Sequence, residues 1–314
     1  MELDLIFHNS DHSDFGKTRV QNLIYKSLLC LQDYEFKVVH PLTLDIEMSG
    51  SSGNLKSMLM FTILNKANNK AILINLSDRL EPNLMENHGF DSFDIVQIIG
   101  GMSIEKQHYE NYKEKLDSVR KPLMIPVDRV YEDDYLLSYT KNPQKKIKKA
   151  VFIGNIYGGR SEIVDILKTH PLFDIKHMIR EEGHPFKEYI EELQKYSVGL
   201  SLNGYAEICY RDIECMATYV PTIRSEYSNK YYNEIIPDYH YIVGSEASCN
   251  GFLAYNKPTK DIADQFIDRM EKIIDNEELL ENISKNGRIY YENNCTLNKI
   301  AQNAMELINL NLLK

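Results

Sequence analysis

The chain has 314 residues, of which 43% are hydrophobic and 26% are charged, and its formal net charge is −10. This length is comfortable for two domains, and the acidic charge argues against a general nucleic-acid-binding protein, which needs a basic face. A pocket for one nucleotide remains compatible with the charge, because it requires only one or two local cations and a helix N-terminus.

Three further patterns concern the compartment. No apolar run approaches the ~18 residues of a transmembrane helix. The opening segment 1–17 lacks the basic and apolar regions of a signal peptide. The five cysteines are scattered and include no Cys-x-x-Cys pair. We therefore expect a cytoplasmic protein with neither a disulfide framework nor a zinc site.

The first half of the sequence alternates strand-like and helix-like segments. Short apolar runs predict strands at 3–9, 34–40, 71–77, 93–101 and 121–128. Helical periodicity predicts helices at 18–32, 54–68 and 104–119. Alternation of this kind is typical of a parallel sheet with helices on both faces.

One basic run, KNPQKKIKKA at 141–150, separates the two halves. We interpret it as a solvated linker, and a phosphate or membrane patch is the alternative.

The alternation restarts after the basic run. Strands are predicted at 149–155, 173–179, 197–203, 220–226 and 239–244. Helices are predicted at 158–170, 186–196 and 210–218, with one or two helices at 259–294 and a last one at 296–313. We therefore predict an α/β fold of two Rossmann-like parallel-sheet domains that face each other across a cleft. Ligands of such folds bind at the carboxyl ends of the strands.

Two junctions between a strand and a helix are rich in polar residues. The first, FHNSDHSDFGKTR, follows the opening strand and is either a polar loop with a helix cap or the floor of a ligand cleft. The second, FIGNIYGGRSE, combines a glycine turn with Arg160 at a helix start, which suits an anion. It matches neither a dinucleotide fingerprint nor a P-loop, so a purely structural turn remains an equal alternative.

A third junction, CYRDIECMA at 209–217, places three charges at a predicted helix start. Asp212 and Glu214 are two residues apart and so do not share a helix face, which disfavours a metal site. Asp212 suits the helix N-terminus, where Arg211 would pair with it. That interpretation explains Glu214 less well. His240 has alternating neighbours and is interpreted as a half-buried structural residue.

Segments of the second half resemble GT-B glycosyltransferases. The segment YSVGLSLNGYAEICYRDIECMATYVPTI at 196–223 is similar to their sugar-nucleotide-binding region, in which a strand, a loop and an E-x-M-A helix precede a G-x-P-x-I-like strand. Tyr219 stands where glycine is common. FIGNIYGGRSEIVDIL at 152–167 and the tail at 273–308 also resemble this family. The resemblance covers roughly 150–314.

The resemblance implies a hexosyl- or pentosyltransferase that moves a sugar from a nucleotide-diphosphate sugar to a hydroxyl acceptor such as a glycan. It implies no metal and no cofactor besides the donor substrate. Glu214 would accept hydrogen bonds from the ribose, and Arg160 and Arg211 would face the diphosphate. The remaining donor-binding candidates lie in the two neighbouring loops and are Gly154, Tyr157, Asn203, Gly204 and Tyr205.

The resemblance also implies an N-terminal acceptor-side domain at 1–147, a donor-side domain at 148–295 and a C-terminal helix at 296–314 that packs back on the first domain. A catalytic base would come from the first domain, and the candidates are His8, Asp14 and Asp128. Two alternatives stay open, a sugar-nucleotide epimerase on the same scaffold and a non-catalytic two-domain ligand-binding protein.

Overall fold

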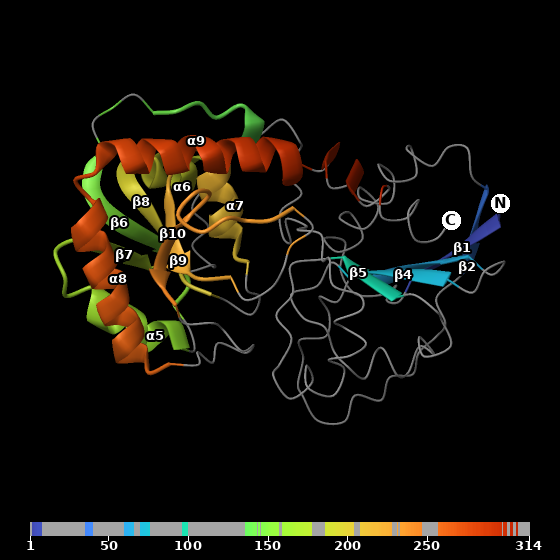
Figure 1. The fold of residues 1–314 in the computed structure, drawn as a ribbon, viewed down its shortest axis with the longest axis horizontal. Helices are drawn as coiled ribbons and strands as arrows, with labels where there is room; N and C mark the ends of the chain where they lie inside the picture. Colours follow the sequence, from blue (N-terminus) through green and yellow to red (C-terminus); the bar gives the residue numbers. More distant parts are fainter. Residues whose placement is uncertain are drawn as a thin grey trace. The chain divides into compact units, whose positions relative to one another are not determined.

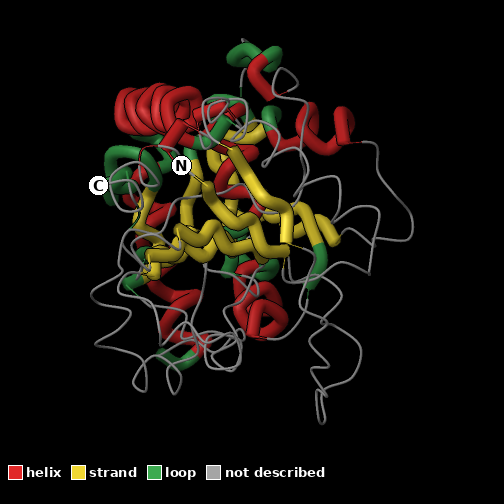
Figure 2. Tube along the Cα trace, turned by 90° about the vertical axis from the view of Figure 1, so that its right-hand side faces the viewer, coloured by secondary structure: helices red, strands yellow, loops and turns green. Residues whose placement is uncertain are grey.

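The computed structural model describes parts of the chain. In the first 130 residues these are the backbones of 2–7, 35–39, 60–65, 70–75 and 96–99. Beyond them it describes 136–142, 144, 146–156, 159–177, 186–203, 208–227, 231, 233–246, 257–296, 298, 299, 302, 303 and 306. Figure 2 colours the described helices red and the described strands yellow.

The chain divides into two compact units. Unit 1 comprises Met1–Val130, Lys230–Asn233 and Thr296–Lys314, and unit 2 comprises Tyr131–Asn229 and Glu234–Cys295. Unit 2 thus includes 131–147, ahead of the predicted domain start at 148. The packing of the C-terminal helix stays a prediction, because most of 296–314 is outside the described residues.

The described part of unit 1 is a five-stranded sheet with the order β2-β1-β3-β4-β5. Its strands are β1 (Glu2–Phe7), β2 (Glu35–Val39), β3 (Met60–Asn65), β4 (Lys70–Asn75) and β5 (Val96–Ile99). β1 runs parallel to β2, and β4 runs parallel to β5. β3 is antiparallel to both of its neighbours, β1 and β4. This sheet is therefore mixed, and the prediction of a parallel sheet in the first half is wrong.

The error lies in the segment 54–68, which we predicted as a helix. Its residues MFTILN form strand β3. A short continuous apolar run fits a buried helix and a buried strand equally well, so periodicity alone cannot assign it. Pairing with β1 and β4 decides for the strand.

Unit 2 contains the parallel sheet that the sequence predicts. The order is β10-β9-β8-β6-β7, and every pair of neighbours is parallel. The strands are β6 (Ile147–Gly154), β7 (Phe173–His177), β8 (Tyr196–Ser201), β9 (Thr222–Ser225) and β10 (Ile242–Ser245). The helices are α5 (Gly159–Leu167), α6 (Phe186–Leu193), α7 (Tyr210–Ala217), α8 (Thr259–Ile273) and α9 (Glu277–Asn294).

Helices cover both faces of the unit 2 sheet (Figure 1). α5 packs against α8 on one face, and α7 packs against α9 on the other. The core on the α5–α8 face joins Phe152 of β6, Ile163 of α5 and Phe266 of α8. On the opposite face, a Cβ at Gly199 would lie 2.5 Å from the sulfur of Cys215. Gly199 therefore allows α7 to lie close on β8. No described helix is long and apolar enough to span a membrane.

The basic run at 141–150 is only partly a linker. Its last four residues begin strand β6. Lys148 pairs with Asp275 at 2.8 Å, and Lys149 pairs with Asp174 at 2.8 Å. The ammonium group of Lys146 donates to the backbone oxygen of Gln194 at 2.6 Å. The interpretation of the run as a linker is therefore wrong for 147–150, because these residues belong to the sheet of unit 2.

Candidate functional site

The strand order of unit 2 reverses between β6 and β8. From β6 the chain passes through α5 to β7 on one side of β6 and then through α6 to β8 on the other. Open α/β sheets bind ligands at the carboxyl ends of the strands at such a switch point. The candidate site is therefore the carboxyl edge, formed by the ends of β6, β8 and β9, the residues that follow them, and the first turns of α5 and α7.

Arg211 links α7 to the two strands of the switch point. Its guanidinium group is buried and donates to the backbone oxygens of Ile153, at the end of β6, and Leu200, in β8. It also lies over the ring of Phe152, 4.2 Å from the ring centroid. A Cβ at Gly154 would lie 2.5 Å from this guanidinium group, so only glycine leaves room for it. Burial opposes the charge of Arg211, but the electrostatic contribution of nearby groups, which include Glu214, outweighs it and raises the pKa of Arg211.

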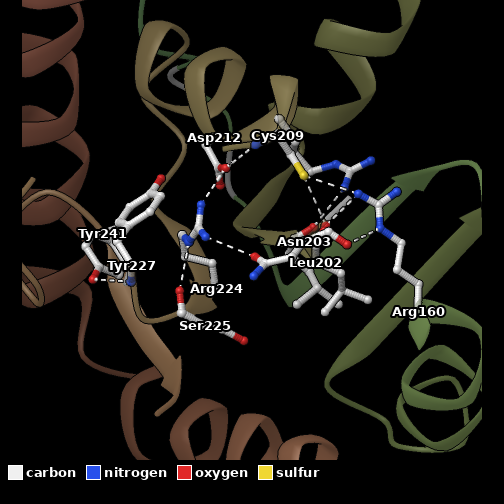
Figure 3. Close-up of polar contacts among 11 residues, drawn as sticks. Arg160, Leu202, Asn203, Cys209, Asp212, Arg224, Ser225, Tyr227 and Tyr241 are labelled. Carbon is white, nitrogen blue, oxygen red and sulfur yellow. Dashed lines mark hydrogen bonds and ion pairs between the residues drawn. The ribbon is translucent and has the colours of Figure 1, made fainter. Parts of the chain in front are cut away.

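Arg160 joins the start of α5 to the end of β8. It is 7% exposed. Its Nε donates to the backbone oxygen of Asn203 at 2.8 Å, and its Nη2 donates to the backbone oxygen of Leu202 at 2.7 Å. The same Nη2 lies 3.2 Å from the sulfur of Cys209, the residue before α7 (Figure 3). Arg160 therefore holds the backbone that leads from β8 towards α7.

Asp212 and Arg224 form a buried ion pair between α7 and β9. Both residues are 0% exposed, and the carboxylate lies 2.6 Å from Nη1 of Arg224. The same Asp212 oxygen accepts from the backbone N–H of Cys209 at 2.7 Å, which confirms the predicted role of Asp212 at the helix start. The predicted pairing with Arg211 is wrong, because Arg211 points to β6 and β8 whereas Asp212 points to β9.

Arg224 is fully engaged at the carboxyl edge. Its Nη2 donates to Oδ1 of Asn203 at 3.0 Å, and its Nε donates to the backbone oxygen of Ser225 at 2.8 Å (Figure 3). Its guanidinium carbon lies 3.5 Å from the ring centroid of Tyr227. The end of β9 is thereby tied to the end of β8.

Glu214 contacts helix α6. It is 6% exposed, and its Oε2 accepts a hydrogen bond from the hydroxyl of Tyr189 in α6 at 2.6 Å. Glu214 follows Arg211 by three residues, so the two share a face of α7. The third charge, Asp212, points away from that face. In the described part of the chain, no three His, Cys, Asp or Glu side chains form a group that could hold a metal ion.

The buried polar atoms of the carboxyl edge that have no hydrogen-bond partner within the described structure include three atoms of amide and charged side chains. They are Nδ2 of Asn203, Nε of Arg211 and Oδ1 of Asp212. Buried polar groups of folded proteins are almost always paired with protein, water or ligand. Two of the three atoms are donors, and three guanidinium groups face two carboxylates at this edge. The arrangement therefore favours an anionic ligand.

Several solved structures are similar to the chain. The pneumococcal O-GlcNAc transferase GtfA, in complex with UDP and GlcNAc, has a TM-score of 0.41 and 13% identity over 74% of this chain and 48% of its own. A structure of the GtfA/B complex has a TM-score of 0.43 and 16% identity over 73% of this chain and 48% of its own. TarM has a TM-score of 0.36 and 12% identity over 80% of this chain and 64% of its own.

These structures are GT-B glycosyltransferases. They are of the family that the segments at 152–167 and 196–223 resemble. The chain spans about half to two thirds of the length of the structures it matches. No family model and no curated protein sequence matches it.

The structure brings together five of the predicted site residues at the carboxyl edge: Gly154, Arg160, Asn203, Arg211 and Glu214. The others, His8, Asp14, Asp128, Tyr157, Gly204 and Tyr205, lie outside the described residues. Both predicted diphosphate ligands, Arg160 and Arg211, donate to backbone carbonyls in this structure. Their role towards a ligand stays a prediction.

Sequence reasoning missed two residues of the edge. Arg224 had a detectable signal, because an arginine inside the predicted strand 220–226 needs a buried partner. Tyr189 had none, since a tyrosine on the apolar face of a predicted helix is usually a core residue.

Proposed function

We propose that the carboxyl edge of unit 2 binds the nucleoside diphosphate of a nucleotide sugar and that the chain is a glycosyltransferase. The observation that carries the proposal is the pair of buried donors, Nδ2 of Asn203 and Nε of Arg211, at the switch point beside an excess of guanidinium groups. Donors of this kind suit phosphate oxygens, and the location is the usual ligand site of a doubly wound sheet.

Glu214 supplies the complementary acceptor. A carboxylate accepts about four hydrogen bonds, so the bond from Tyr189 is compatible with two more from a ribose diol. Because Glu214 and Arg211 share a face of α7, one helix presents an acceptor for the ribose next to a cation for the diphosphate.

The same groups favour glycosyl transfer chemically. As the bond between the sugar and the diphosphate breaks, negative charge grows on the leaving phosphate. Cations that are already fixed in place stabilise that charge without rearranging. In this proposal the sugar passes to a hydroxyl acceptor, no metal takes part, and the base is one of His8, Asp14 and Asp128 in unit 1. The cleft between two domains and the returning C-terminal helix are part of the same proposal.

Titration calorimetry with a panel of nucleoside diphosphates and nucleotide sugars tests the binding step. Wild type is expected to bind one class of nucleotide. Glu214→Gln keeps the shape of the side chain and removes its charge, and it should weaken binding by about 1.5–3 kcal/mol, the worth of hydrogen bonds to a charged group. Glu192→Gln is the matched control, because Glu192 pairs with Lys195 at 2.7 Å near the start of β8.

Equal affinities of the two variants would remove Glu214 from the site, and absence of nucleotide binding by wild type would overturn the proposal. Product analysis then separates the reactions. A glycosyltransferase needs an acceptor to consume the donor productively, an epimerase converts the donor alone, and a non-catalytic protein leaves it unchanged.

A further inference from the structure

The hydrogen bond between Tyr189 and Glu214 joins α6, which precedes β8, to α7, which follows it. Its length is 2.6 Å, and it spans 25 positions of the sequence. Both side chains are buried, with 8% and 6% exposed. The ring of Tyr189 also packs against the ring of Phe186, with centroids 5.8 Å apart. Tyr189 is therefore held in one place by packing, and it holds the Glu214 carboxylate in turn.

The proton of this bond belongs to the tyrosine. Burial raises the pKa of Tyr189 well above its ordinary value, and the negative charge of Glu214 raises it further. The hydroxyl keeps its proton and donates, and the carboxylate accepts.

A fixed carboxylate matters for a diol. A glutamate side chain has three rotatable bonds, and ordering it on binding costs conformational entropy. The bond from Tyr189 orders the side chain of Glu214 before a ligand arrives. A carboxylate held in one orientation can accept one hydrogen bond from each of two neighbouring hydroxyls. When one hydroxyl is missing, one of these two bonds is lost.

We propose that Tyr189 is a positioning residue that orients Glu214 for the two ribose hydroxyls, so that the site selects ribonucleotides over 2′-deoxyribonucleotides. This inference rests on the proposed function, because it assigns the ribose to Glu214. A site built to bond a hydroxyl rejects the analogue that lacks it, since a buried acceptor is then left unpaired.

The test compares the affinities of a ribonucleoside diphosphate and its 2′-deoxy counterpart by titration calorimetry, with UDP and 2′-deoxy-UDP first and the other bases in parallel. Wild type is expected to prefer the ribose form by about tenfold or more, the worth of one hydrogen bond to a charged group. In Tyr189→Phe the affinity for the ribose form should fall by about tenfold, and that for the 2′-deoxy form, which keeps one hydroxyl bonded to Glu214, should fall by less. The preference for the ribose form then becomes smaller.

Tyr196→Phe is the matched control. It also deletes a hydroxyl that donates to a carboxylate, that of Asp174 at 2.9 Å, but at the start of β8 and away from the carboxyl edge. This variant should keep the wild-type preference. Tyr189→His retains an aromatic ring with an N–H donor and should keep part of the preference, which provides a second reading if Tyr189→Phe does not fold.

The outcomes separate the inference from the proposed function. If wild type binds no nucleotide, the proposed function fails, and the role of Tyr189 fails with it. If wild type binds both sugar forms equally, nucleotide binding stands and the ribose selection is overturned. If Tyr189→Phe weakens both forms to the same degree, or neither, Tyr189 has only a structural role and the inference is overturned.

Discussion

The charged side chains described here are buried at the carboxyl edge of the unit 2 sheet and exposed at its amino edge. At the carboxyl edge Arg211, Asp212 and Arg224 are each at most 8% exposed, and every one is bonded to backbone or to a charged partner. At the amino edge, where the strands begin, the pairs are exposed. The side chains of Lys148 and Asp275 are 46% and 81% exposed in their pair.

The difference separates buried charges, whose partners the fold depends on, from exposed charges, whose pairing contributes little to stability. A surface pair gains little, because water competes for both ions and the side chains lose freedom. A buried ion loses its hydration and must regain it from fixed partners, so losing one partner is costly. Buried charges are common at functional sites, and the switch point is the edge at which open α/β sheets bind ligands. The contrast can be tested from its largest expected effect to its smallest.

The largest effect is expected for Arg224→Met. The variant leaves the Asp212 carboxylate buried without the cation that lies 2.6 Å away. The free energy of unfolding should fall by about 3–5 kcal/mol, measured by urea denaturation. The double variant Arg224→Met with Asp212→Asn should recover part of this loss, because no uncompensated charge remains. A loss below about 1 kcal/mol would place this pair in the same class as surface pairs and break the comparison.

A smaller effect is expected for Gly154→Ala. The new methyl group would lie 2.5 Å from the guanidinium group of Arg211, which must then move off the backbone oxygen of Ile153. Overpacking of this kind costs about 1–3 kcal/mol of unfolding free energy. Combined with Arg211→Met, the same substitution should cost clearly less than it does alone, since the colliding group is gone. Strict additivity of the two effects would show that Gly154 serves some other purpose.

His240 lies just before β10 and is half buried, so it stands between the buried charges of the carboxyl edge and the exposed charges of the amino edge. Burial lowers the pKa of His240 to about 4, from an unfolded value near 6.5. Its Nδ1 accepts from the backbone N–H of Ile236 at 2.9 Å. Because the folded pKa is the lower one, the stabilisation is fully present above about pH 6.5 and is lost as the pH falls towards 4. Urea midpoints of wild type should decline over this window, and those of His240→Asn should decline less. Parallel curves would contradict the assignment.

The smallest effect is expected for Lys148→Met at the amino edge. Lys148 pairs with Asp275 at 2.8 Å, yet both side chains remain in water. The urea midpoint should stay within error of wild type at low and at high salt, because solvent and ions already screen the pair. A clear loss of stability, present at low salt only, would show that the amino edge depends on its ion pairs after all.

Tyr219 is unusual in the sequence, and the structure shows which contacts hold it. Tyr219 occupies a position at which GT-B glycosyltransferases, the family that this segment resembles, commonly have glycine. Its φ is +59°, in the left-handed region that favours glycine. Its backbone oxygen accepts from the hydroxyl of Ser284 at 2.9 Å, and the guanidinium carbon of Arg288 lies 5.1 Å from its ring centroid. The sequence marks the position as unusual, and contacts from α9 show how a tyrosine is held there.

Prediction from sequence worked best where the periodicity was long or repeated. The strands and helices of unit 2 appear close to the predicted ranges, because apolar strands alternate there with clearly amphipathic helices. It failed at β3, where a short apolar run has no period that distinguishes a strand from a helix. The same limit applies to sheet direction, since antiparallel pairing of β3 is a property of the neighbours it meets.

The features of the candidate site likewise fall into two groups, those that depend on local sequence and those that depend on tertiary packing. The sequence by itself determined that a parallel sheet is present, that Arg160, Arg211 and Glu214 follow its strands, and that Asp212 and Glu214 cannot act as one chelating pair, because these features depend on local spacing. Only the tertiary structure decided that Asp212 pairs with Arg224 and that Glu214 is held by Tyr189. Those partners are 12 and 25 residues away, and their contacts arise only when β8, β9, α6 and α7 pack into one unit.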